Sequence, residues 1–174
     1  MKKHLSIGDC FEITKQGTAT FSLEKYHNSI FYHLFASIPI SKANQTYDSQ
    51  YEFFIPEGVK TLSKAAFQLP HLFGEITLPS SLKTIGSDFF NNANVTKVTL
   101  QNDCVLNSNS FNGATDLSKF ETNVYKINLK GPNHFLSTSI SHINLDGIFL
   151  SPNPNDNKRS FSNTKLTHVT IPHH

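Results

Sequence analysis

Two histidines are the side chains with the clearest capacity for chemistry. Neutral imidazole binds transition metals and transfers protons near neutral pH. His142 and His168 would lie next to each other if the strands expected around them are neighbours in a parallel sheet. Zinc normally takes three or four protein ligands, and no cysteine or carboxylate completes this pair by its spacing. We therefore expect no metal site and no bound cofactor, and we interpret the two histidines as a surface pair.

The rest of the sequence offers no catalytic arrangement. No Ser-His-Asp or Cys-His set is supported, and the eight glycines are scattered without the spacing of a phosphate-binding loop. Cys10 and Cys104 are far apart and define no disulfide framework, so we expect two unpaired thiols. These observations favour a protein that is not an enzyme.

Charge and hydropathy exclude several kinds of partner. A net charge of +2 is too small to favour nucleic acid or an anionic membrane surface. No apolar run has the length of a signal peptide or of a membrane span, so we expect no membrane insertion. The chain therefore stays inside the cell, or its export signal lies outside this sequence, or it is exported by another route.

The elements that would position the histidines come from a repeat. Similar phrases of the type Ile-Thr-Leu recur at spacings of 23, 22, 22, 23 and 26 residues. The last residues of these phrases, which we call the anchors, are Ile55, Leu78, Leu100, Thr122, Leu145 and Ile171. Self-similarity at this period is typical of a solenoid, in which each unit buries its apolar face only against its neighbours.

Other positions repeat together with the anchors. Apolar residues stand two and five positions before them, which gives the alternating pattern of a half-buried strand. The two sets are Phe53, Ile76, Val98, Phe120, Ile143 and Val169, and Phe73, Val95, Leu117, Ile140 and Leu166. An aromatic follows each of the first five anchors by about twelve residues or more: Phe67, Phe90, Phe111, Phe135 and Phe161. This spacing predicts a column of stacked phenylalanines.

Two segments carry a family resemblance. Ile-Pro-x-x-Val-x-x-Leu at 55–62 and Leu-Pro-x-x-Leu-x-x-Ile-Gly-x-x-x-Phe at 78–90 resemble the BspA-type leucine-rich repeat, and the likeness extends over about residues 51–172. The unit 122–145 lacks the Pro and Ile-Gly signals, and the last unit has extra residues around 151–159. The resemblance implies surface-exposed adhesion or host-interaction roles, and hence a cell-surface or secreted protein.

We therefore expect a β-rich, right-handed leucine-rich-repeat solenoid of parallel strands, with about five units over residues 51–174. Residues 1–50 do not match the repeat. Phe11, Ile13, Ala19, Phe21 and Leu23 alternate around a Gly-containing turn at 15–17 and predict a hairpin. Apolar residues at helical spacing predict a helix over 26–38. We interpret 1–50 as an α+β cap on the first unit, with a separate functional module as the alternative.

The outward positions of the strands form a candidate binding surface. If the strands stack in register, the positions three before each anchor make one row, which is acidic at one end and basic at the other. Its members are Glu52, Glu75, Lys97, Lys119, His142 and His168. Glu121 stands beside Lys119 in the adjacent row. We predict that these seven residues bind a protein ligand; the alternative is an ordinary solvated face.

The last strand, 166–171, has no sequence after it that would cover its edge. Three explanations compete: the array is cut from a longer one, the edge is an interface that permits self-association, or Pro172 and the flanking charges protect it. The function that we predict is protein–protein interaction. The alternatives are an enzyme or effector with a site in the N-terminal module or between cap and repeats, and a structural spacer.

Overall fold

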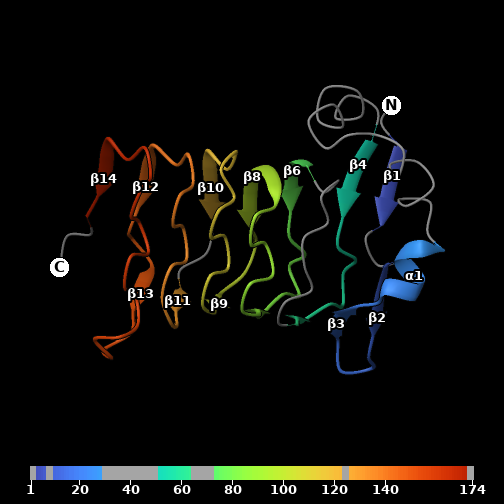
Figure 1. The fold of residues 1–174 in the computed structure, drawn as a ribbon. Helices are drawn as coiled ribbons and strands as arrows, with labels where there is room; N and C mark the ends of the chain where they lie inside the picture. The colour runs from blue at the N-terminus through green and yellow to red at the C-terminus, as the bar shows by residue number, and fades with distance from the viewer. Residues whose placement is uncertain (1–2, 7–9, 29–50, 64–72, 123–125, 172–174) are drawn as a thin grey trace.

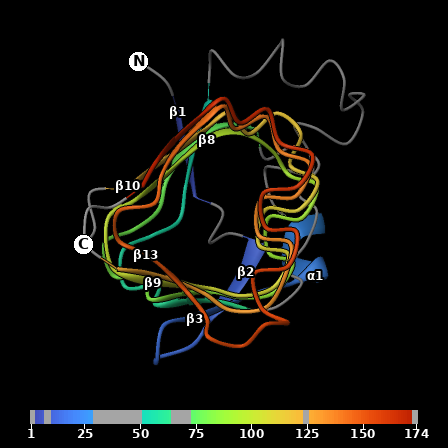
Figure 2. The same cartoon turned by 90° about the vertical axis from the view of Figure 1, so that its left-hand side faces the viewer.

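A computed structural model describes residues 3–6, 10–28, 51–63, 73–122 and 126–171. The chain winds in successive turns, here called coils, whose strands lie side by side along the molecule (Figure 1). Viewed along the solenoid axis, the coils superpose in a closed outline (Figure 2). Two sides of the outline carry strands and the third carries stacked turns. The predicted β-rich solenoid of parallel strands is confirmed.

One side of the solenoid is built from the strands that contain or precede the anchors, and we call it the strand face. Its strands are β1 (Lys3–Ser6), β4 (Tyr51–Phe54), β6 (Phe73–Thr77), β8 (Asn94–Leu100), β10 (Lys119–Thr122), β12 (His142–Asn144) and β14 (His168–Thr170). They pair in parallel as β1–β4, β6–β8–β10 and β12–β14. Because the repeat length is nearly constant, equivalent residues of the repeat strands face each other, except at the start of β6–β8, where a register shift between Gly74 and Glu75 places Phe73 opposite Asn94.

The second side is one seven-stranded sheet in the order β13-β11-β9-β7-β5-β3-β2. Its strands are β2 (Phe11–Ile13), β3 (Thr18–Phe21), β5 (Thr61–Leu62), β7 (Thr84–Ile85), β9 (Cys104–Leu106), β11 (Ile127–Leu129) and β13 (Ile148–Leu150). All neighbours are parallel except the β2–β3 hairpin. Inward-pointing aliphatic residues of the middle strands are no more than 1% exposed: Leu62, Ile85, Leu106 and Leu129.

The third side is a ladder of turns that are hydrogen-bonded from coil to coil. The N–H groups of Phe90 and Phe111 donate to the carbonyls of Ser110 and His134, each at 2.9 Å. The turns require a left-handed backbone at one repeated position, where φ lies between 53° and 72° in Asn92, Gly113, Ser137 and Asn163. Since Gly and Asn tolerate this conformation best, the turns account for part of the high asparagine content.

Inside the turns, four phenylalanines form the predicted column. The ring centroids of Phe90, Phe111, Phe135 and Phe161 lie 5.2, 5.5 and 5.5 Å apart in succession, with interplanar angles of 7°, 7° and 11°. The first three rings are fully buried. The prediction of a stacked column is confirmed for these four; Phe67 lies outside the described residues.

The N-terminal hairpin is confirmed, but the elements after it differ from the prediction. Leu23 was expected in a strand and is instead the first residue of helix α1 (Leu23–His27). The helix begins there because Ser22 caps it: the Ser22 Oγ accepts a hydrogen bond from the Lys25 N–H at 3.2 Å. Residues 29–38 of the predicted helix lie outside the described residues.

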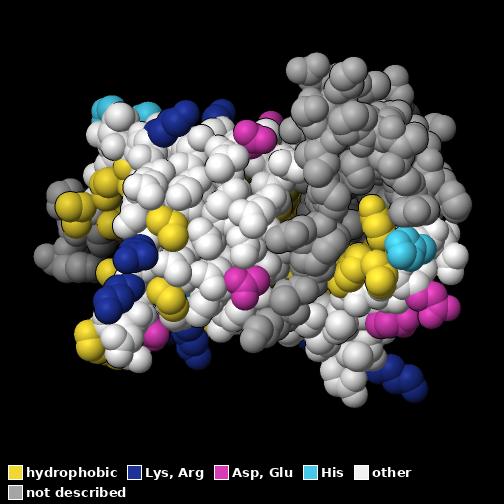
Figure 3. Space-filling model, in the orientation of Figure 1, with side chains coloured by type: hydrophobic (Ala, Val, Ile, Leu, Met, Phe, Trp, Pro, Cys, Tyr) yellow, Lys and Arg dark blue, Asp and Glu magenta, His cyan; other side chains and the backbone are white. Residues whose placement is uncertain are grey.

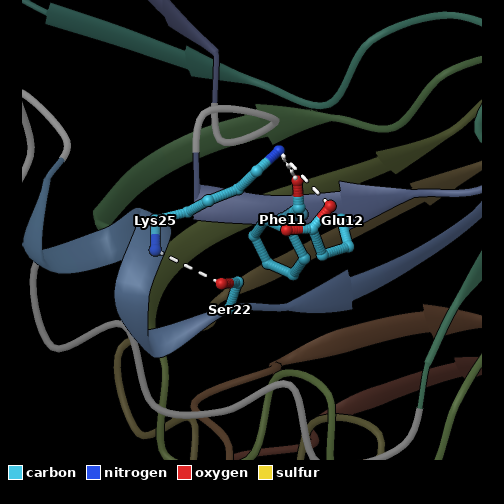
Figure 4. A network of polar contacts seen from close by, with 4 residues as sticks. All are labelled: Phe11, Glu12, Ser22 and Lys25. Atoms are coloured by element: carbon cyan, nitrogen blue, oxygen red, sulfur yellow. Dashed lines mark hydrogen bonds and ion pairs between the residues drawn. The ribbon is translucent and has the colours of Figure 1, made fainter.

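Lys25 ties this helix back to the hairpin (Figure 4). Its Nζ donates to the Phe11 carbonyl at 2.9 Å and lies 3.7 Å from the Glu12 carboxylate. Both charged side chains are substantially exposed, so the carbonyl contact, together with the cap at Ser22, holds the helix more than the ion pair does.

The N-terminal strands extend both strand-bearing sides. β1 pairs with β4, and β3 pairs with β5. The N–H groups of Lys60 and Thr61 both donate to the Gly17 carbonyl at 2.7 and 3.1 Å. In the next coil, Lys83 and Thr84 donate to the Lys60 carbonyl in the same way, at 2.8 and 3.1 Å. The described residues 3–6 and 10–21 therefore continue the backbone pairing of the coils without the repeat sequence, and a domain boundary at residue 50 stays a prediction.

Candidate functional site

The predicted row of outward residues exists on the strand face. Register places Glu75 opposite Lys97 and Lys97 opposite Lys119, and it places His142 opposite His168. We call these five residues and Glu121 the strip. Its side chains are exposed, apart from the half-buried Lys97. Figure 3 shows the histidines at one end of this edge of the molecule, with cationic and then acidic side chains following.

Glu52, the first member of the predicted row, pairs in register with His4 of β1. The side chain of Glu52 lies outside the described part of the structure. The predicted row therefore also continues into the N-terminal segment at the level of the backbone, where no repeat signal indicated a strand partner.

The ion pair within the strip differs from the expected arrangement. Glu121 was expected beside Lys119, but its carboxylate lies 3.1 Å from the Nζ of Lys97 on the neighbouring strand. Diagonal neighbours on adjacent strands are within reach of long side chains, and Lys97 is the less exposed of the two partners, at 27% against 53%. Among the described residues, Lys119 has no carboxylate partner.

The two histidines lie together as predicted. Their ring centroids are 4.5 Å apart and the ring planes are nearly parallel, with an interplanar angle of 2°. Each Nδ1 lies within hydrogen-bond distance of the hydroxyl of the preceding residue, Ser141 at 2.8 Å and Thr167 at 2.9 Å. Parallel rings do not direct their nitrogens at one point. In the described ranges, no group of three or more His, Cys, Asp or Glu residues could hold a metal ion.

The junction of hairpin and repeats, where a site was the alternative prediction, contains a small apolar pocket. Its cavity volume is about 10 Å³, which leaves room for about one water molecule. Its lining residues are Phe11, Ile13, Ala19, Ile55, Pro56, Val59 and Leu62. None of these side chains can transfer a proton or act as a nucleophile, so this pocket supplies no catalytic group.

Two buried cysteines lie away from the strip. Burial raises the pKa of the Cys104 thiol to about 12, because the residue occupies a core position opposite Ile127 of the neighbouring strand. A thiol of that pKa is inert as a nucleophile at neutral pH. Cys10 is also buried in the core.

His134 is the buried titratable residue that the sequence analysis missed. It is fully buried beside the phenylalanine column, at the position that Phe89, Ser110 and Ser160 occupy in other coils. Its Nε2 lies 2.8 Å from the Gly131 carbonyl, so that nitrogen carries the proton, while Nδ1 has no hydrogen-bond partner among the described residues. The signal was available: His134 directly precedes Phe135, one of the column phenylalanines.

Acid is expected to destabilise the fold through His134. Burial lowers the pKa of this imidazole, because the charged form loses its solvation. Below the unfolded pKa of about 6.5, the unfolded chain therefore binds a proton that the native state does not. Stability should be constant above that pH and fall as the pH decreases from about 6.5, by up to ~1.4 kcal/mol per pH unit.

Urea unfolding of the native chain and of His134→Gln, measured from pH 7.5 to 5.5, tests this expectation. The His134→Gln variant should have a lower stability at neutral pH but a flatter pH profile. The matched control is His142→Gln, which removes an exposed histidine. Equal slopes for the native chain and His134→Gln would show that His134 is charged in the folded protein.

Comparison with known proteins supports the fold of this chain but identifies no ligand. The sequence matches one family model, described as a BspA type Leucine rich repeat region, in six copies over residues 41–153. No curated protein and no solved structure matches. In the described residues, no helix is long and apolar enough to cross a membrane.

Proposed function

We propose that this chain, which belongs to the BspA-type leucine-rich repeat family, is a protein-binding module that uses its strand face and carries out no reaction itself. The repeat scaffold supports the coarse form of the proposal, since solenoids present extended surfaces to partners. The finer form, an adhesion or host-interaction protein at a cell surface, is what the family resemblance implies.

The observation that carries the proposal is the register of the strip. Parallel neighbours lie about 4.8 Å apart, so within β6–β8–β10 and within β12–β14 the strip offers side chains at a regular interval to an extended ligand. Within the described ranges Lys119 has no carboxylate partner, since Glu121 is engaged by Lys97, so Lys119 can bind a carboxylate of that ligand. Beyond it, the stacked imidazoles of His142 and His168 form a flat platform on which a planar or aromatic group can pack.

A selection of displayed random peptides against the immobilised chain tests the proposal. Peptides that bind should lose about tenfold in affinity, equivalent to ~1.4 kcal/mol, against a variant carrying Lys119→Ala, His142→Ala and His168→Ala. The matched control replaces outward residues of the seven-stranded sheet, with Lys60→Ala, Lys83→Ala and Asn128→Ala.

The control should bind the same peptides as the native chain does. If the control loses binding and the strip variant retains it, the interaction surface lies on the opposite side of the solenoid. If no peptide is enriched over an unrelated solenoid, we would conclude that the chain is a structural spacer and not a binding module.

A further inference from the structure

Two charges of the strip take no part in its ion pair. Lys97 and Glu121 neutralise each other, with their charged atoms 3.1 Å apart. Glu75 and Lys119 are exposed, and neither has an ion-pair partner among the described residues. The three-stranded sheet β6–β8–β10 therefore presents one unpaired anion on one outer strand and one unpaired cation on the other.

The register of the sheet fixes the interval between these two charges. Glu75 lies opposite Lys97, and Lys97 lies opposite Lys119, so the two unpaired charges belong to one row on strands two apart. Because neighbouring parallel strands are about 4.8 Å apart, the two backbone positions are separated by about 10 Å along the solenoid axis. Hydrogen bonds join all three strands and hold this interval.

Short polar side chains lie next to this row. Thr77 and Thr99 face each other across β6 and β8, and Thr99 faces Glu121 across β8 and β10. The Thr77 side chain is exposed and the Thr99 side chain is half-buried. These small residues leave room for a ligand chain that crosses the strands, and their hydroxyls can bond to its backbone.

We propose that this surface binds an extended segment of a partner protein in the polyproline II conformation, with a basic and an acidic residue three positions apart. The proposal rests on the protein-binding function proposed above and names the class of ligand. Polyproline II has three residues per turn and rises roughly 3.1 Å per residue, so residues three apart lie on the same side at about 9 Å. That interval matches Glu75 for the basic residue and Lys119 for the acidic one.

Other extended arrangements fit the two charges less well. A β-strand places side chains on one side at intervals of about 7 Å, so its charges would lie about 7 or 14 Å apart. In polyproline II, separations of two or four residues point the second side chain away from the face. This conformation also exists largely before binding, which lowers the entropic cost of ordering the ligand. The bound segment then runs along the solenoid axis, across the strands.

Selection from a display library of proline-rich peptides tests this inference. Each peptide has two randomised positions, separated by two, three or four residues, and is selected on the whole native chain at low ionic strength. We expect enrichment of one basic and one acidic residue at a separation of three. Their Kd should be about fivefold lower than that of the same pair at the other separations, and the difference should vanish in about 1 M salt.

Reversing the charges should change the selected pair in a defined way. Lys119→Glu should enrich two basic residues, and Glu75→Lys should enrich two acidic ones. The double variant should again enrich one of each, because the segment can lie in either direction. A recovered preference cannot result from misfolding. Lys83→Glu is the matched control: it makes the same charge change at an exposed position beside the seven-stranded sheet, and should keep the native preference.

Two results would overturn this ligand class and leave the protein-binding function intact. The enriched peptides could lack the charge pair, or Lys119→Glu could enrich the same pair as the native chain. The ligand class is also wrong if this library yields no binder while the random peptides of the preceding section do bind through the strip. If neither library yields a binder, both proposals are wrong.

Discussion

Replacing Phe111 by alanine is expected to cost about 3–5 kcal/mol of the free energy of unfolding. Phe111 stacks between Phe90 and Phe135 and contacts Phe120 edge-on at 5.7 Å. Its ring is fully buried in the middle of the solenoid. Removing it leaves a cavity that cannot collapse easily, because the turn around it is fixed by hydrogen bonds to the coils on both sides.

The matched variant is Phe161→Ala, at the last position of the same column. Phe161 is partly exposed and, among the described residues, stacks only on Phe135, so its loss should cost about 1–2 kcal/mol. Urea unfolding at low protein concentration gives both values. Equal losses for the two variants would mean that stacking within the column does not determine stability, and that each turn is held by its own hydrogen bonds.

Gly17→Ala is expected to destabilise the protein more than Gly58→Ala, by about 2 kcal/mol. Both glycines have a left-handed backbone, with φ of 87° and 96°, so both substitutions introduce a similar strain. They differ in their surroundings. A Cβ at Gly17 would lie 2.6 Å from the Gly58 carbonyl oxygen and 3.1 Å from the Lys60 nitrogen, whereas a Cβ at Gly58 has nothing within 4 Å.

The additional cost arises because the neighbours of Gly17 are backbone atoms that cannot move aside. The hairpin turn must withdraw from the first coil, and the hydrogen bonds from Lys60 and Thr61 to the Gly17 carbonyl are lost. Hydrogen exchange at these two amides separates this explanation from simple backbone strain. Faster exchange in Gly17→Ala but not in Gly58→Ala is expected; faster exchange in both would refute the docking explanation.

The strip shows which features of the candidate site could be predicted from the sequence. The repeat spacing was enough to place Glu75, Lys97 and Lys119 in one row, and to place His142 beside His168. It was not enough to choose the partner of Glu121, because that depends on side-chain reach across the strands and on the partial burial of Lys97. Whether the strip binds a ligand stays a prediction.

The N-terminal segment shows where sequence patterns fail. The alternation of apolar residues predicted a strand that includes Leu23. Helix α1 begins at Leu23 instead, because the Ser22 hydroxyl caps it. The Gly17 turn carries no repeat signal, yet it occupies the place that Lys60 and Lys83 occupy in later coils. Backbone hydrogen bonds between parallel strands do not depend on side-chain identity, so a segment can continue the sheet without the repeat.

By itself, the sequence determined the solenoid, the inward columns and the stacked phenylalanines, because a repeat of nearly constant length places the same residue types at the same points of every coil. The tertiary structure determined the properties of residues whose surroundings differ from those of an inner coil. It showed that a Cβ at Gly17 would meet the neighbouring backbone, that the Nδ1 of buried His134 has no hydrogen-bond partner in the described part of the chain, and that Leu150, Val169 and Ile171 are exposed. No local sequence pattern marks these residues, because their surroundings depend on how segments far apart in the sequence pack against them.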